Sequence, residues 1–265
     1  FKSGPDLKDF ENCIKKNTKG IYIESPSNPL LKIVDMQLIS KMAKSKKLWT
    51  MIDNTFASPV NQNPIDFGID LVIHSATKYL GGHSDISAGA VISSKDRINR
   101  VYELAKSLGG TLSEFSAWLL ERSIKTLPIR VWQQNENAME LANFLNSHSL
   151  ISKVYYPGLI NHEGHEIAKR QMKGFGGMLS IELHPSIKPE LFLKNLKIIK
   201  PVMSLAGIES TANYPKLTSH YSLTDKERSL QAISDQLIRL SAGIESIIDL
   251  KNDIDNSLKW SENEN

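Results

Sequence analysis

Three short apolar segments, each ending in polar residues, recur within the first 75 residues of the chain. Gly20–Glu24, Leu48–Ile52 and Leu71–Ile73 have the length and the apolar content of buried strands. Between the first two, Val34–Lys46 has apolar residues at helical spacing. Strands that alternate with helices are typical of a mostly parallel sheet. The sequence therefore predicts an α/β fold, in which ligands bind at the carboxyl ends of the strands.

The third segment leads into Ser75-Ala76-Thr77-Lys78-Tyr79-Leu80-Gly81-Gly82, a loop with one lysine between hydroxyl residues and glycines. Because Ala90–Ile92 follows as another apolar segment, we expect Lys78 between two buried strands. Burial favours the neutral amine, which is a nucleophile able to form a Schiff base. The hydroxyl groups of Ser75 and Thr77 and the N–H groups of the glycines are potential donors to an anion. A solvated loop lysine is the alternative interpretation.

Polar residues also follow the other two strands. Asp53 comes directly after Leu48–Ile52, and Asn28 lies in the proline-rich loop after the first strand. A carboxylate, a lysine and hydroxyl groups together suit pyridoxal phosphate: the lysine forms the imine, the carboxylate keeps the pyridine nitrogen protonated, and the hydroxyls bind the phosphate. For Asp53 alone, a turn-capping role stays open, because Asp-Asn-Thr is a favourable turn sequence.

The composition argues against several classes of protein. The 40% hydrophobic and 23% charged residues are ordinary for a soluble globular protein, and the net charge of +3 is small, so neither a nucleic acid nor a membrane partner is expected. Cys13 is the only cysteine, which excludes an internal disulfide and favours a cytoplasmic location. His162 and His165 lie three residues apart, but the rest of a zinc site is missing, so we expect no metal.

The remaining elements are expected to be mainly helical at first and then to alternate again. We predict helices over 6–17, 96–108, 111–127 (ended by Pro128), 130–145, 162–172 and 190–196, and strands near 154–156, 178–183 and 237–241. A domain boundary is predicted near the long third helix, which divides the chain into 1–135 and 136–265. Arg239 falls on the strand face opposite Ile238 and Leu240, where a surface ion pair is its simplest interpretation.

Blocks of residues along nearly the whole chain resemble one family. These are Ser75–Asp85 with Ala88-Gly89, Glu24–Leu30, Val34-Asp35, Asp53–Phe56, Gly158, Gly164-His165, Ser204–Gly207, Glu209-Ser210, Ser219-His220 and Arg239–Glu245. In this order they closely resemble the pyridoxal-phosphate-dependent enzymes of cysteine and methionine metabolism, such as cystathionine γ-synthase, cystathionine β- and γ-lyases and methionine γ-lyase. The resemblance implies the type I (aspartate-aminotransferase-like) fold, with part of a mostly parallel, seven-stranded-type sheet and a smaller C-terminal α/β domain.

The resemblance also implies roles in holding the cofactor. Lys78 would carry pyridoxal phosphate as a Schiff base and would move protons at the substrate carbons. Asp53 would pair with the pyridine nitrogen, and Ser75 and Thr77 would bind the phosphate. Asn28 would lie beside the ring's phenolic oxygen and the substrate carboxylate.

For the substrate, the resemblance implies that Arg239 grips the carboxylate of a sulfur amino acid as a two-pronged fork, with Ser204 helping. Family members with γ-chemistry often have glutamate just before that serine, whereas this chain has Met203, as in lyases. The resemblance therefore favours a carbon–sulfur lyase that acts on cystathionine or a related amino acid by β- or γ-elimination. A cystathionine γ-synthase, which joins cysteine to an acylated homoserine, is the alternative. His220 lies in a matching block without an assigned role.

Two readings of another class stay open at this point: a non-catalytic truncated paralogue, and a Schiff-base aldolase, which would need neither Asp53 nor the phosphate hydroxyls. The family's large domain normally begins well before Ser25, so we expect a chain that is N-terminally truncated and binds the cofactor weakly by itself. The family also implies a homotetramer, built as a dimer of dimers.

Overall fold

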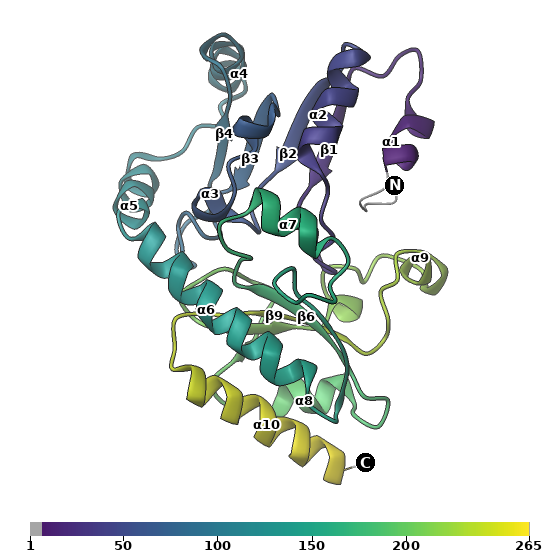
Figure 1. The fold of residues 1–265 in the computed structure, drawn as a ribbon. Helices are drawn as coiled ribbons and strands as arrows, with labels where there is room; N and C mark the ends of the chain where they lie inside the picture. The colour runs from purple at the N-terminus through teal and green to yellow at the C-terminus, as the bar shows by residue number, and fades with distance from the viewer. Residues whose placement is uncertain (1–6, 265) are drawn as a thin grey trace.

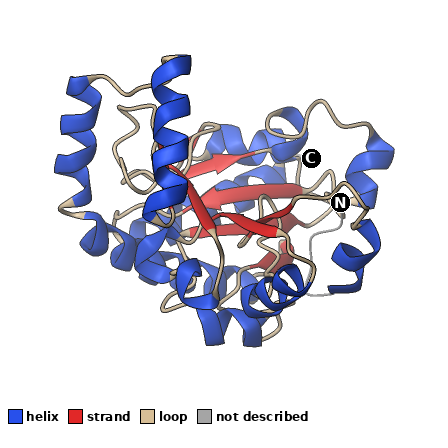
Figure 2. Ribbon diagram, turned by 90° about the horizontal axis from the view of Figure 1, so that it is seen from above, coloured by secondary structure: helices blue, strands red, loops and turns tan. Residues whose placement is uncertain are grey.

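The computed structural model describes residues 7–264, which form two sheets connected and covered by helices (Figure 1). Seen from above, the strands run through the middle and the helices surround them (Figure 2). The first predicted helix starts at Asp6, which lies outside the described residues. Of its described part, Leu7–Cys13 is helix α1, which ends four residues before the predicted end at Asn17. Within residues 7–264, no helix combines the length and the apolar character needed to cross a bilayer.

The first sheet contains the three predicted strands as parallel neighbours. Its order is β1 (Gly20–Glu24), β2 (Trp49–Asp53), β3 (Leu71–Ser75) and β4 (Gly89–Ile92). Helix α2 (Met36–Ser45) begins at the Asp35 cap, whose carboxylate accepts the Leu38 N–H at 3.0 Å. Its buried face and the inward side chains of β1 and β2 form one apolar cluster. The carboxyl ends of β1, β2 and β3 therefore lie side by side, as predicted.

Strand β4 differs from the expectation of a buried strand. It runs antiparallel to β3, and Val91 and Ile92 are 40% and 44% exposed. The reason is its place at the edge of the sheet, where it pairs on one side only. Lys78 thus lies in a loop between one buried strand and one exposed edge strand.

The middle of the chain is mainly helical. Two short helices, α3 (Ser58–Asn61) and η1 (Pro64–Phe67), connect β2 to β3. Three longer helices follow β4: α4 (Lys95–Leu108), α5 (Glu114–Ile124) and α6 (Leu127–Asn146). We predicted that Pro128 ends a helix reaching Leu127, but this is wrong: Pro128 lies in the first turn of α6. Proline is accepted there because the N–H groups of a first turn have no partner within the helix.

The second sheet has the order β5 (Ile151–Tyr155), β6 (Met178–Leu183), β9 (Leu237–Ser241), β8 (Thr211–Asn213) and β7 (Lys200–Pro201). One face packs on α6 and α10 (Ile247–Asn263), and Ser180 and Arg239 on the other face contact the loop after β1. Further short helices complete this half: α7 (His165–Gln171), α8 (Pro189–Asn195), η2 (Pro215–Leu217) and α9 (Asp225–Leu230). Helix α7 starts three residues later than predicted, because His162 and Glu163 form a turn before it.

Helix α6 belongs to both halves. Leu127 and Val131 near its start pack with Tyr79 and Leu80 of the lysine loop, whereas its later turns pack under the second sheet. The predicted boundary between residues 135 and 136 falls inside this continuous helix, and the division into two domains stays a prediction.

Candidate functional site

The ends of the parallel strands are tied together by side chains. Glu24 ends β1 directly beside Asp53, which ends β2. The Asp53 carboxylate accepts the Thr55 N–H at 2.9 Å, and the Thr55 hydroxyl accepts the Ser75 N–H at 2.8 Å. The Tyr22 hydroxyl lies 3.5 Å from the other Asp53 oxygen. The predicted carboxylate and the start of the lysine loop therefore share one edge of the sheet.

Lys78 is held in this loop by backbone hydrogen bonds. Its N–H donates to the Ser75 carbonyl at 3.1 Å, and its carbonyl accepts the Gly82 N–H at 2.7 Å. The side chain is half-buried, and burial, followed by the charge of Arg239, lowers the pKa of its amine. A solvated loop lysine would not have this environment. The lowered pKa increases the share of neutral, nucleophilic amine at neutral pH.

The sequence suggested that the N–H groups of the loop glycines donate to an anion, but in the structure they donate to the backbone. The N–H of Gly81 donates to the Ala76 carbonyl at 2.8 Å, and the N–H of Gly82 is used as described above. Gly82 has φ +72°, and a Cβ there would meet the guanidinium of Arg130. That guanidinium donates to the Tyr79 carbonyl at 2.9 Å. The glycine therefore lets a buried arginine pack under the loop.

The two hydroxyl groups differ in their surroundings. The Thr77 hydroxyl accepts the Ala88 N–H at 3.0 Å and lies 3.3 Å from the Ala88 carbonyl. The Ser75 hydroxyl has no hydrogen-bond partner within residues 7–264. Ser75 is thus the hydroxyl that can bind an anion without giving up another contact.

Arg239 is buried, not a surface residue. It is 3% exposed, and its guanidinium donates to Asn28 Oδ1 and to the Met203 carbonyl, both at 3.0 Å. It has no carboxylate partner in the described part of the chain, so the surface ion pair is wrong. Burial lowers its pKa to about 10. A buried cation without a carboxylate is costly, and a carboxylate ligand would relieve that cost.

Ser204 and His220 lie around this arginine. Ser204 is partly buried next to Met203, and its carbonyl accepts the Thr211 hydroxyl at 2.9 Å, which fixes its backbone. Burial and then the charge of Arg239 lower the pKa of His220. The structure therefore brings His220 close enough to sense Arg239, which its neighbours in the sequence could not indicate.

Glu24 is a second residue that the sequence left without a role. Its carboxylate accepts the Asn28 N–H at 3.0 Å. Burial raises its pKa to about 7; the charge of Asp53 acts in the same direction, and the Asn28 N–H opposes both. The sequence could have indicated Glu24 as a site residue, because it lies at the end of a predicted strand, the feature by which Asp53 was identified. Glu24 positions the loop that places Asn28 against Arg239.

We expect Glu24→Gln to remove a pH dependence of stability. The pKa of Glu24 is higher in the folded chain, about 7, than its ordinary value of 4.5. The neutral acid therefore contributes fully below pH 4.5, and this stability is lost as the pH rises to about 7, by roughly 3 kcal/mol in the extreme. Urea unfolding between pH 4.5 and 8 measures it. The glutamine amide keeps an acceptor for the Asn28 N–H but does not titrate. The difference in the free energy of unfolding between the two proteins should therefore grow with pH. A difference that stays constant would contradict the raised pKa of Glu24.

The site residues suit pyridoxal phosphate by their chemistry. An amine of lowered pKa, a carboxylate and a hydroxyl that has no partner among the described residues meet at one sheet edge. An uncompensated buried guanidinium lies close enough to affect the amine. The amine suits the aldehyde of the cofactor, the carboxylate its pyridine nitrogen and the hydroxyl its phosphate, and the guanidinium suits the carboxylate of the substrate. The donor set therefore fits the cofactor that the sequence predicted.

Comparisons with known proteins agree. The family model described as "Cys/Met metabolism PLP-dependent enzyme" matches residues 1–259. A cystathionine beta-lyase of Lactococcus lactis subsp. cremoris is 45% identical over 255 residues, which cover 96% of this chain and 67% of that protein. The chain thus spans about two thirds of the length of such relatives.

Solved structures show the same fold. A cystathionine gamma-lyase from Lactobacillus plantarum, complexed with L-serine, is 40% identical with a TM-score of 0.95, over 97% of this chain and 68% of that one. A cystathionine gamma synthase from Xanthomonas oryzae pv. oryzae, in complex with cystathionine, is 40% identical with a TM-score of 0.94, over 98% and 67%. The predicted fold class is confirmed; in the described residues the first sheet has four strands and the second has five. The chain belongs to the pyridoxal-phosphate-dependent enzymes of cysteine and methionine metabolism.

Proposed function

We propose that the protein is a carbon–sulfur lyase of trans-sulfuration, acting by elimination on cystathionine or a related sulfur amino acid. The observation that carries this choice is Met203. Its carbonyl accepts from Arg239, so its side chain, 60% exposed, borders the position assigned to the substrate carboxylate. An apolar side chain there offers no second carboxylate, which agrees with the lyase pattern. The 45% identity to a cystathionine beta-lyase supports the same choice.

The residues at the strand ends would hold the cofactor. Pyridoxal phosphate supplies an electron-accepting ring that stabilises negative charge at the substrate α-carbon. Lys78 would bind its aldehyde carbon, the Asp53 carboxylate would keep the pyridine nitrogen protonated, and Ser75 and Thr77 would donate to the phosphate. For Thr77 this requires its hydroxyl proton to turn away from the Ala88 carbonyl.

The same residues would then act on the substrate. Arg239 would bind its α-carboxylate in a bidentate pair, with Asn28 and Ser204 beside it. The Lys78 amine, whose lowered pKa favours its neutral form, would take the proton from the α-carbon and return a proton later in the reaction. Positioning by a buried guanidinium also keeps the α-carbon within reach of that amine.

The test is a pair of assays on the same protein. With cystathionine we expect a keto acid, ammonia and a free thiol, without a new thioether. With cysteine and an acylated homoserine, the formation of cystathionine would overturn the lyase and support a γ-synthase. The likeness to the Xanthomonas oryzae enzyme is the observation that favours this alternative. The absence of product in both assays, together with no fixation of pyridoxal phosphate by borohydride, would support a non-catalytic paralogue.

We expect Arg239→Lys to raise the KM for the sulfur amino acid about 10- to 100-fold, with a smaller effect on kcat. The lysine cannot form a two-pronged pair and leaves Asn28 or the Met203 carbonyl without its donor. Loss of one charge-assisted bond is worth about 1.5–3 kcal/mol. Steady-state kinetics measure the split between KM and kcat.

Arg170→Lys is the matched control, since Arg170 is 55% exposed and pairs with Asp35 away from the site. An unchanged KM in Arg239→Lys would contradict the substrate role of Arg239.

We also propose that the protein forms a homo-oligomer, with a homotetramer as the family's expected form. Large apolar side chains are exposed on α4, α5 and the start of α6: Leu108, Phe115, Trp118, Ile129 and Trp132 are 55–75% exposed. The helices α4 and α5 stand out from the rest of the chain in Figure 1. Apolar surfaces of this kind are typical of protein interfaces. Sedimentation equilibrium tests this; a monomer at all concentrations would overturn it.

A further inference from the structure

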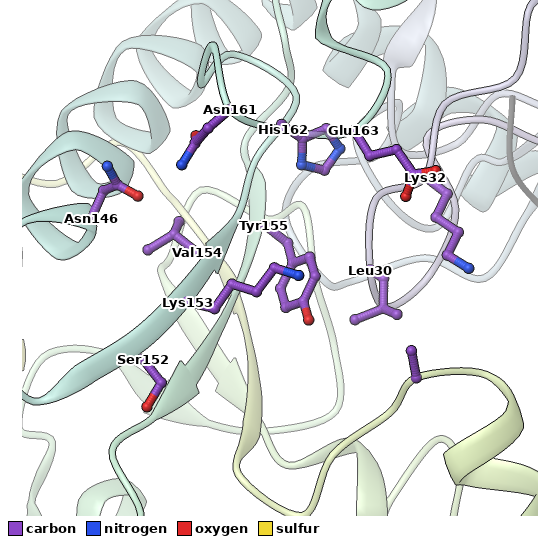
Figure 3. Close-up of a pocket in the computed structure, with 11 residues that line it drawn as sticks. Leu30, Lys32, Asn146, Ser152, Lys153, Val154, Tyr155, Asn161, His162 and Glu163 are labelled. Atoms are coloured by element: carbon purple, nitrogen blue, oxygen red, sulfur yellow. The ribbon is translucent and has the colours of Figure 1, made fainter.

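A cavity lies on the second sheet, apart from Lys78 and Asp53 (Figure 3). Its volume is about 310 Å³, within the range of roughly 300–1,000 Å³ that is usual for small-molecule pockets. Five segments bound it: β5 with Lys153 and Tyr155, the loop with Leu30 and Lys32, the turn before α7 with Glu163, the end of α6 with Asn146, and the turn after α9 with Ala232.

The cavity has an apolar floor and charges of both signs at its rim. Leu30, only 5% exposed, and the Tyr155 ring form this floor, whereas the Val154 side chain points to the other side of β5 (Figure 3). The Lys153 ammonium lies 4.6 Å from the centre of the Tyr155 ring, and Glu163 is exposed. Within residues 7–264, neither Lys153 nor Glu163 has an ion-pair partner. Lys32 lines the cavity as well and has no ion pair in that part of the chain either, so the rim offers two cations and one anion beside an apolar surface.

The charges of Lys153 and Glu163 lie near the same buried ring. Burial lowers the pKa of His162, while the charge of Glu163 raises it and that of Lys153 lowers it. The ring is fixed, because His162 Nε2 lies 3.0 Å from the Leu31 carbonyl. This contact ties the turn that carries Glu163 to the loop of Leu30 and Leu31, and Leu30 lines the cavity together with Lys153.

This loop also leads to the site described above. Tyr155 of β5 pairs with Ser180 of β6, which pairs with Arg239 of β9, so these three side chains share one face of the sheet. The Ser180 hydroxyl donates to the Pro29 carbonyl at 2.7 Å, next to Asn28. A ligand in the cavity would therefore touch the loop that places Asn28 against Arg239.

We propose that this cavity is a second amino-acid site, separate from the one at Arg239, for a free α-amino acid with an apolar side chain. The carboxylate would pair with Lys153, the ammonium with Glu163, and the side chain would lie on Leu30 and the Tyr155 ring. A zwitterion uses charges of both signs, whereas a simple carboxylate would leave Glu163 unused.

The test titrates L-methionine by isothermal calorimetry into the protein without added pyridoxal phosphate, so that no reaction occurs. In the Arg239→Lys variant, which weakens the other site, we expect one saturable site per chain. Adding Lys153→Met should raise its Kd roughly tenfold, because a charge-assisted bond is lost. The matched control is Lys169→Met, an exposed lysine on α7 outside the cavity. Lys153 is itself exposed, so the variant should fold, which thermal unfolding checks.

A second probe distinguishes the ligand class. N-acetyl-L-methionine keeps the carboxylate and the side chain but lacks the ammonium, so it should bind several-fold more weakly. Equal affinity for both probes would overturn an amino-acid site. A Kd for L-methionine that Lys153→Met leaves unchanged, or no saturable binding in the Arg239→Lys variant and in the unaltered chain, would also overturn it. If Arg239→Lys fails to fold, the Lys153→Met difference in the unaltered chain decides.

Discussion

In the active enzyme, Lys78→Ala is expected to abolish covalent fixation of pyridoxal phosphate by borohydride and to lower kcat about 10³-fold or more. The alanine removes both the amine that binds the cofactor and the group that moves the α-carbon proton, and proton transfer by a positioned side chain alone contributes roughly 10²- to 10⁴-fold. The lysine is suited to this by its half-buried place and its lowered pKa. Peptide mass spectrometry after borohydride reduction measures the fixation, and keto acid formation measures kcat.

The control for this substitution is Lys95→Ala, an exposed lysine at the start of α4. It should change neither readout. Added methylamine should restore part of the kcat of Lys78→Ala, because a small amine can enter the space left by the side chain and carry the proton. Fixation of the cofactor on another lysine of Lys78→Ala, with activity retained, would contradict the role of Lys78.

For Asp53→Asn we expect a loss of about 10²-fold in kcat/KM and weaker cofactor binding. The asparagine keeps an oxygen that accepts the Thr55 N–H, so the strand end should stay in place. What disappears is the negative charge that keeps the pyridine nitrogen protonated, and losing one partner of such a charge pair costs about 2–5 kcal/mol. Titration with pyridoxal phosphate, followed by its absorbance, separates the binding effect from the rate effect.

Asp66→Asn, at an exposed aspartate of η1, is the matched control and should leave both quantities unchanged. Activity of Asp53→Asn within threefold of the unaltered enzyme would show that another group protonates the ring nitrogen.

Most of the regular structure could be predicted because it is specified locally. The strands β1, β2 and β3 lie within two residues of their predicted ends, since short apolar segments between turn residues have few other ways to fold. The two shortest strands of the second sheet, β7 and β8, were missed. They contain two and three residues, and they are strands only because β9 pairs with β8 and β8 with β7.

The surroundings of the site residues could not be predicted in the same way. Lys78, Asp53 and Ser75 were identified from strand ends, and Arg239 from its matching block. Their burial and contacts depend on elements far away in the chain. Arg239 contacts Asn28 across 211 positions, and the N–H groups of Gly81 and Gly82 are used inside the loop. No local pattern encodes such contacts.

The sequence by itself determined the α/β fold, the family and the lysine around which the site is built, because alternating apolar segments and ordered motif blocks are local and specific. Only the tertiary structure decided that Arg239 is buried without a carboxylate from residues 7–264, that Glu24 is a neutral acid up to about pH 7, and that a cavity on β5 lies beside the Asn28 loop. The physical reason is that burial, pKa and unpaired charge are properties of the surroundings of a side chain, and these are assembled from segments distant in sequence.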